Sequence, residues 1–173
     1  MRIHRRASVL ATALALAACD LPTGEQHVTA PLFNQGAGQE HAVTGSGHVP
    51  SGDGLREFTF HAVRNVDGAA RGSYKIEFTA TGLFVLVDVT CLSVVGNTGW
   101  VGGRIVDSNI PVVRIGTVSY FYAIDNGEGA GAAPDRVSVA RLNDVDGEDI
   151  RFCTDRPLLL PAFDVQSGNA QVR

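Results

Sequence analysis

Apolar and polar residues alternate with a period of two along much of this chain, and this alternation limits its fold more than any other feature. In the run from Phe58 to Ala62, apolar residues occupy every second position, with a threonine and a histidine between them. The run from Tyr74 to Ala80 repeats the pattern with a lysine, a glutamate and a threonine. Side chains of a β-strand point alternately to opposite faces, so each run predicts a strand with one buried face. From Asp20 onward, no stretch of ten or more residues keeps the 3.6-residue period of an amphipathic helix.

Turn-forming residues separate these runs at short intervals and favour many short antiparallel strands. Asp67-Gly68 and Gly96-Asn97-Thr98-Gly99 are typical of tight turns, and the 20 glycines show no collagen-like repeat. Further strands are expected at 83–95, 100–106, 118–122, 137–142, 150–154 and 170–172. Residues 42–54 are expected to form a loop with at most a short first strand. We therefore expect an all-β fold, an antiparallel sandwich or small barrel of about eight to ten short strands, as a single domain over residues 45–173.

Residues 1–18 have the layout of a secretory signal peptide with a helical segment. Three arginines lie within the first six residues, and an uncharged stretch follows that is shorter than the roughly 20 residues of a transmembrane helix. The stretch ends in Leu16-Ala17-Ala18-Cys19, which resembles the lipobox of bacterial lipoproteins. The resemblance implies cleavage before Cys19, acylation of its sulfur and a lipid anchor in the bacterial cell envelope, without indicating which membrane. The alternative is ordinary cleavage after Ala17, which would leave Cys19 as a plain thiol.

The charge of the chain excludes two classes of partner surface. Residues 1–18 contain three of the 14 basic residues and none of the 18 acidic ones, so the remainder has a formal net charge of −7. An acidic surface is repelled by anionic membranes and by nucleic acid. We therefore expect the lipid on Cys19, rather than a basic patch, to hold the protein at a membrane, and we expect no nucleic-acid partner. Residues 19–44 are expected to be the lipidated cysteine and a flexible linker.

The three cysteines fit this arrangement. With Cys19 acylated, Cys91 and Cys153 remain as one pair, and an unpaired thiol is unfavourable in an oxidising compartment. We expect a disulfide between them, which would close a loop of roughly 60 residues and stabilise the fold by about 4 kcal/mol. The expected strands place the two residues differently. Cys91 shares a face with apolar residues, whereas Cys153 shares a face with Asp149 and Arg151.

Two acidic loops are candidates for calcium, which binds about six to eight oxygen ligands. Asp125, Glu128 and Asp135 lie in or beside a glycine-rich loop and form the candidate metal site. The second loop contains three aspartates between residues 144 and 149 but lacks the ligand spacing of an EF-hand. The alternative for both loops is a solvated turn, because Asp-Gly and Asn-Gly favour turns for backbone reasons. No other cofactor is expected.

Four short runs of the sequence are similar to a group of small secreted bacterial β domains that often follow choice-of-anchor domains. The runs are 58–62, 72–78, 89–94 with 96–98, and 125–129. The resemblance covers about residues 45–172 and implies a β fold. Members of this group have no known activity, so the resemblance implies no mechanism. Here Gly129 stands where the loop of the group usually has proline.

The sequence contains no familiar catalytic motif, so we do not expect an enzyme. It lacks the Gly-x-Ser-x-Gly elbow, the His-Glu-x-x-His zinc motif and a Walker loop. Tyr120, Tyr122 and Trp100 either pack in the core or form an exposed platform for a sugar or peptide. By elimination, we expect a lipid-anchored envelope module with a structural or protein-binding role and an envelope protein as partner. The alternatives are a small-ligand or calcium-dependent carbohydrate binder and a hydrolase.

Overall fold

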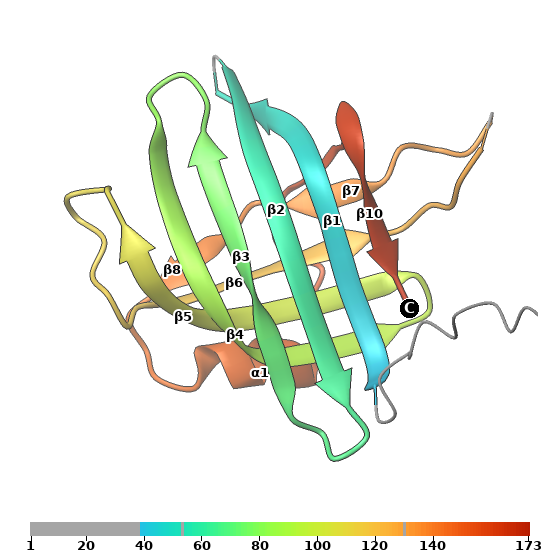
Figure 1. Ribbon diagram of the computed structural model, residues 1–173, viewed down its shortest axis with the longest axis horizontal. Helices are drawn as coiled ribbons and strands as arrows, with labels where there is room; N and C mark the ends of the chain where they lie inside the picture. The colour runs from blue at the N-terminus through green and yellow to red at the C-terminus, as the bar shows by residue number, and fades with distance from the viewer. Residues whose placement is uncertain (1–38, 53, 130) are drawn as a thin grey trace, which may run out of the picture. The chain divides into compact units, whose positions relative to one another are not determined.

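The computed structural model describes residues 39–52, 54–129 and 131–173 (Figure 1). The expected signal peptide over residues 1–18, the lipidated Cys19 and the linker up to residue 38 lie outside the described residues. The described part contains ten β-strands and one α-helix. No helix in this part is both long enough and apolar enough to cross a bilayer.

The strands form one antiparallel sheet. They are β1 (Gln39–Ser51), β2 (Gly54–Asn65), β3 (Ala70–Phe78), β4 (Leu83–Val95), β5 (Thr98–Ser108), β6 (Val118–Ile124), β7 (Arg136–Ser138), β8 (Arg141–Asn143), β9 (Ala162–Asp164) and β10 (Ser167–Val172), and the helix α1 is Glu148–Asp155. The order across the sheet is β10-β1-β2-β3-β4-β5-β6-β7-β9, with β8 beside β6. Every pair in this order is antiparallel. The expected all-β antiparallel fold is confirmed.

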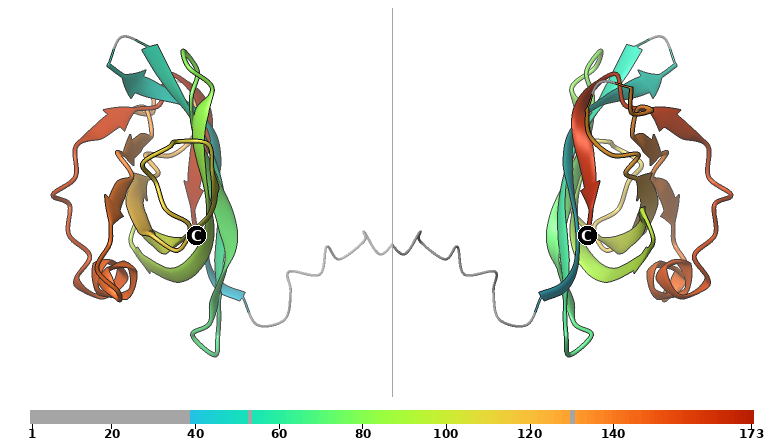
Figure 2. Two further views of the ribbon diagram at one scale, coloured as in Figure 1. Left: turned by 90° about the vertical axis from the view of Figure 1, so that its left-hand side faces the viewer. Right: turned by 90° about the vertical axis from the view of Figure 1, so that its right-hand side faces the viewer.

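The sheet curls so that its two halves face each other across the main apolar core. Figure 1 shows β5 and β6 running behind β1, β2 and β3 in a crossing direction, and Figure 2 shows the two layers from the side. The ring of Phe121, on β6, meets Phe60 and Tyr74 with centroid separations of 5.1 Å and 4.9 Å. Buried and exposed residues alternate along most of β2 and the middle of β3. The period-two runs of the sequence therefore supply the inward faces of the first layer.

The first strand begins earlier than the sequence indicates. β1 starts at Gln39, so residues 39–44 are strand and not the expected flexible linker. Most of the loop expected over residues 42–54 is also strand paired with β2, and residues 43–48 pair with β10 as well. Gly45 weakens the apolar alternation here, but close packing requires it. A Cβ on Gly45 would lie 2.6 Å from the carbonyl oxygen of Asn169 and 2.7 Å from the ring of Phe60. The glycine therefore belongs to a tightly packed strand and not to a turn.

Replacing Gly45 with alanine should lower the free energy of unfolding by about 2–3 kcal/mol, because the added methyl group would push β1 away from the backbone of β10. Urea unfolding followed by circular dichroism measures this change. Gly54→Ala is the matched control, since a Cβ there would find its nearest contact 3.6 Å away, at Ala80. We expect the control to stay within about 0.5 kcal/mol of the natural protein. Equal losses in both variants would contradict the close packing of β1 against β10.

Candidate functional site

A β-bulge in β4 places Cys91 on the outer face of the sheet. Val89 faces the main core and pairs with Gly103 on β5. Cys91 pairs with Gly102, so Thr90 is the extra residue of the bulge. One extra residue reverses the alternation, and Cys91 therefore faces α1 on the outside of the sheet. The expectation that Cys91 shares a face with the neighbouring core valines is wrong for this reason.

The residues opposite Cys91 form the helix α1, where the sequence indicated a strand over residues 150–154. The helix begins after Gly147, which has a φ of 81°, and two acidic residues in its first turn interact favourably with the helix dipole. Asp149, Phe152 and Cys153 are buried on one side of α1, at the i, i+3, i+4 spacing of a helix. A helix of eight residues is too short for its period to stand out clearly from alternation.

A disulfide bond joins Cys91 to Cys153 and fixes α1 on the sheet. The two Cα atoms are 6.2 Å apart, which is within the usual range for a disulfide. The pairing expected from the sequence is therefore confirmed. Because the two cysteines are 62 positions apart in the sequence, the bond removes much of the freedom of the unfolded chain, worth about 4 kcal/mol in a chain-entropy model.

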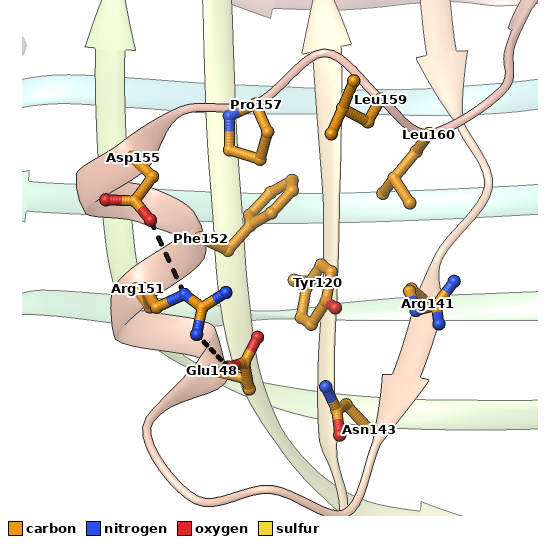
Figure 3. Close-up of a pocket in the computed structure, with 10 residues that line it drawn as sticks. All are labelled: Tyr120, Arg141, Asn143, Glu148, Arg151, Phe152, Asp155, Pro157, Leu159 and Leu160. Atoms are coloured by element: carbon orange, nitrogen blue, oxygen red, sulfur yellow. Dashed lines mark ion pairs between the residues drawn. The ribbon is translucent and has the colours of Figure 1, made fainter.

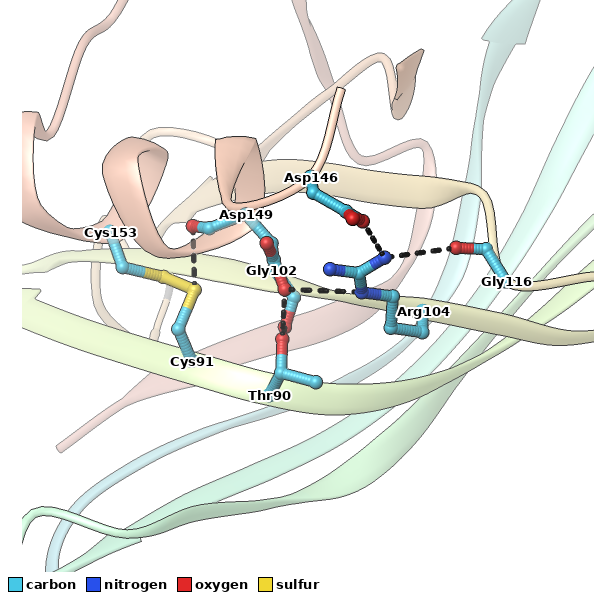
Figure 4. A network of polar contacts seen from close by, with 8 residues as sticks. All are labelled: Thr90, Cys91, Gly102, Arg104, Gly116, Asp146, Asp149 and Cys153. Atoms are coloured by element: carbon cyan, nitrogen blue, oxygen red, sulfur yellow. Dashed lines mark hydrogen bonds and ion pairs between the residues drawn. A yellow bond between two sulfur atoms is a disulfide. The ribbon is translucent and has the colours of Figure 1, made fainter. Parts of the chain in front are cut away.

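Beside the disulfide, the buried carboxylate of Asp149 also joins α1 to the sheet (Figure 4). Thr90 Oγ1 donates a hydrogen bond to Asp149 Oδ2, and Arg104 Nε lies 3.9 Å from the same oxygen. Arg104 Nη1 also donates to Asp146 at 2.7 Å, and this hydrogen bond raises the pKa of Arg104 above its usual value. A Cβ on Gly102 would lie 3.0 Å from the Cβ of Asp149. The sheet therefore needs a glycine where α1 approaches it.

A surface pit of about 490 Å³ opens between α1 and β8 (Figure 3). At its base, the ring of Tyr120, on β6, stacks on the ring of Phe152, on α1, with centroids 4.5 Å apart. Pro157, Leu159 and Leu160 close one end of the pit. We call this feature the α1 pit, and its lining is completed by Arg141, Asn143, Glu148, Arg151 and Asp155.

Charged side chains form the rim of the α1 pit. Arg151 Nη1 lies 2.9 Å from a carboxylate oxygen of Glu148, and its Nε lies 3.6 Å from one of Asp155. Arg141 lies across the pit, on β8, and is exposed. It makes no ion pair and no side-chain hydrogen bond with any residue in the described part of the chain. The pit therefore combines an apolar base with two arginines and two carboxylates, and Arg141 is the one of these four that forms no ion pair with the described residues.

The three aromatic residues that the sequence analysis considered as a platform lie buried beneath the α1 pit. Trp100, Tyr120 and Tyr122 are each at most 7% exposed, so the core alternative holds and an exposed platform does not form. Trp100 Nε1 donates a hydrogen bond to the Pro157 carbonyl at 3.0 Å, and the Tyr122 hydroxyl donates to the Leu160 carbonyl at 2.8 Å. These two bonds hold the segment that closes the end of the pit.

Asp125 and Asp135, two of the candidate metal ligands, bind the backbone of the edge strand β10. Asp135 is buried and accepts hydrogen bonds from the N–H groups of Asn126 at 2.8 Å and Ala170 at 2.9 Å. Asp125 accepts a hydrogen bond from the N–H of Val172 at 3.0 Å. An edge strand exposes unpaired backbone groups, and here carboxylates from the β6–β7 loop satisfy two of them. The loop thereby latches β10 to the second layer of the sheet.

Glu128, the third candidate ligand, accepts a hydrogen bond from the side-chain amide of Asn169, also on β10. In the second acidic loop, Asp146 binds Arg104 and Asp144 accepts a hydrogen bond from Thr117. Within the described ranges, no group of three or more His, Cys, Asp and Glu side chains is arranged to hold a metal ion. Calcium binding stays a prediction, and the carboxylates proposed for it serve as acceptors for groups of the protein itself.

Comparison with known proteins adds no further guide. No family model, no curated protein and no solved structure matches the chain. The resemblance to secreted bacterial β domains therefore stays a prediction.

The α1 pit was not expected from the sequence, although the charges of Glu148, Arg151 and Asp155 have the i, i+3, i+7 spacing of a helix face.

Replacing Asp135 with alanine should lower the free energy of unfolding by about 3 kcal/mol, because two backbone N–H groups would lose a charged acceptor in a buried place. Chemical unfolding of both proteins at neutral pH measures the difference. Asp107→Ala is the control, since Asp107 is an exposed acid on β5, and it should change stability by about 0.5 kcal/mol or less. A small effect of Asp135→Ala would show that the loop does not latch β10.

Proposed function

We propose that this chain is a lipid-anchored protein of the bacterial cell envelope whose β domain binds a partner protein through the α1 pit. The anchor is the lipid expected on Cys19. The partner presents an apolar side chain beside an acidic group. One observation supports this binding mode: the pit places the apolar surface of Tyr120, Phe152 and Leu160 next to the guanidinium of Arg141, which forms no ion pair with the described residues.

Exposed leucines beside the α1 pit favour a protein partner. Leu159 is 89% exposed and Leu158 is 55% exposed, and both lie in the segment that closes the pit. Scattered exposed apolar residues are common on protein surfaces, but neighbouring ones that border a recess mark interaction sites. The leucines extend the apolar surface beyond the pit, as contact with a folded or extended segment of another protein requires.

A small ligand with an apolar body and a carboxylate is the second candidate occupant. The pit volume of about 490 Å³ lies within the roughly 300–1,000 Å³ of small-molecule sites. The interior of the sheet is less suitable, because the void between Phe58, Phe60 and Phe121 measures about 10 Å³. Such a void holds at most one water molecule. A ligand with an apolar body and a carboxylate would therefore lie in the α1 pit and not inside the curled sheet.

Calcium-dependent carbohydrate binding and hydrolysis have less support in the geometry of the described residues. Calcium-dependent carbohydrate binding would use the loop carboxylates, which in this structure accept hydrogen bonds from β10. A hydrolase would need reactive carboxylates at a pocket. The two at the α1 pit, Glu148 and Asp155, both bind Arg151.

A photo-reactive amino acid at position 159 should form a specific cross-link to a protein partner in living cells, because Leu159 borders the pit. The matched control is position 112, since Val112 is 87% exposed on the β5–β6 loop. Arg141→Glu should reduce the cross-link several-fold by repelling the acidic group of the partner. Cross-links at both positions, or none at position 159, would contradict a partner site at the α1 pit. A small molecule retained in native mass spectra and lost in Arg141→Glu would favour the second candidate.

Mass spectrometry of the intact protein extracted from its own membrane should show acyl chains on a polypeptide that begins at Cys19. Cys19→Ser should abolish the added mass and release the protein from the membrane fraction. An unmodified polypeptide that begins elsewhere, at Ala18 for example, would contradict the anchor. That result would leave the partner site at the α1 pit untouched, because the two parts of the proposal depend on different residues.

A further inference from the structure

A second recess lies on the other flank of α1, between the helix and parts of β2 and β4. Its volume is about 350 Å³, and the disulfide between Cys91 and Cys153 contributes to its wall. Two arginines line it: Arg64 comes from β2, and Arg156 follows the last residue of α1. We call it the arginine recess. Ser93, on β4, is a further polar residue of its lining.

Arg64 brings an unsatisfied donor to the arginine recess. Its Nη1 donates a hydrogen bond to the Leu92 carbonyl at 3.3 Å, and its Nη2 lies 3.0 Å from a carboxylate oxygen of Glu40. Its Nε is buried and has no hydrogen-bond partner in the described part of the chain. A buried donor without a partner is unfavourable, and a charged one more so. The guanidinium of Arg64 therefore brings a positive charge with one unsatisfied donor to the wall of the arginine recess.

Arg156 occupies a backbone conformation that favours glycine. It has φ 55° and ψ 49°, and it is the sole non-glycine residue of the described ranges with a left-handed φ. Its N–H closes the helix by donating to the Phe152 carbonyl, a role that glycine fills at lower conformational cost. Its guanidinium makes no ion pair among the described residues. Compared with glycine, arginine at this position adds a positive charge. This charge lies at the arginine recess and near the carbonyl end of α1.

We propose that the arginine recess binds a phosphate group. The guanidinium groups of Arg64 and Arg156 and the hydroxyl of Ser93 supply its donors. Arginine suits this task because its planar fork of N–H groups matches the oxygens of a phosphate. Glu40 neutralises part of the charge of Arg64, so Arg156 decides whether an anion is held.

The phosphate can come from a free phosphate compound or from the headgroup of a phospholipid. Gly68, in the β2–β3 turn, also lines the arginine recess, and the end of β2 that leads into this turn pairs with the first residue of β1. The recess thus lies at the end of the sheet where β1 begins. Phosphate binding at the arginine recess depends on neither Cys19 nor the α1 pit. It can therefore be tested independently of the proposed function.

Isothermal titration calorimetry tests the site, with inorganic phosphate titrated into the full-length protein in detergent. A parallel titration with monomeric short-chain phosphatidylglycerol distinguishes the two sources. Saturable binding of inorganic phosphate assigns a free phosphate compound, and binding of the phospholipid alone assigns a headgroup. Binding of neither at millimolar concentration would overturn the proposal.

Arg156→Gly separates ligand binding from folding. It should weaken the binding of the phosphate probe roughly tenfold, while the melting temperature rises by about 3 °C because glycine relieves the left-handed conformation. Arg156→Lys keeps the charge but not the fork of donors, so we expect a several-fold loss of affinity. Arg114→Ala is the control, since it removes an equal charge from the exposed β5–β6 loop. A higher melting temperature with unchanged phosphate affinity in Arg156→Gly would overturn the assignment. An equal loss of phosphate affinity in Arg114→Ala would overturn it as well.

Discussion

The covalent bond between Cys91 and Cys153 gives the sheet its outer layer. Without the bulge at Thr90, Cys91 would face the main core and could not reach α1. With the bulge, the cysteine meets the helix, and α1 is held against the outer face of β4, β5 and β6. The α1 pit and the arginine recess are both bounded by α1. The helix supplies Phe152 and Arg151 to the α1 pit on one flank and leads to Arg156 in the arginine recess on the other.

Close approach of backbone elements recurs throughout the fold, and glycine makes it possible at each place. Gly102 admits α1 to the outer face of β5, and Gly45 admits β10 and the Phe60 ring to β1. The polar groups brought in by these approaches are mostly satisfied within the protein. Asp149 accepts from Thr90 beneath α1, and the latch residue Asp135 accepts from two backbone N–H groups, one of them on β10. The apolar core and the glycine contacts therefore determine how the strands pack. Hydrogen bonds to the buried carboxylates of Asp149 and Asp135 then hold α1 and β10 in place.

The period-two runs of β2 and β3 could be predicted because each strand has one face in the core, and the disulfide could be predicted from cysteine parity. Other features have no comparable signal. Gly45 and Gly47 interrupt the apolar pattern of β1, and the bulge at Thr90 reverses the face of Cys91. Neither departure can be found from local periodicity, because each depends on a neighbouring strand. The α1 pit draws its lining from β6, β8, α1 and the segment after α1, so no single stretch of sequence reveals it.

Hydrogen–deuterium exchange of the full-length protein, before and after reduction of the disulfide, tests most directly whether the bond holds the outer layer. In the oxidised protein, amides of α1 should exchange slowly, close to the rate of their neighbours on β5. After reduction, we expect α1 and the segment that follows it to exchange much faster, while β1, β2 and β3 keep their protection. Equal protection of α1 in the oxidised and reduced forms would show that packing alone holds the helix. That result would contradict the central role assigned to the bond between Cys91 and Cys153.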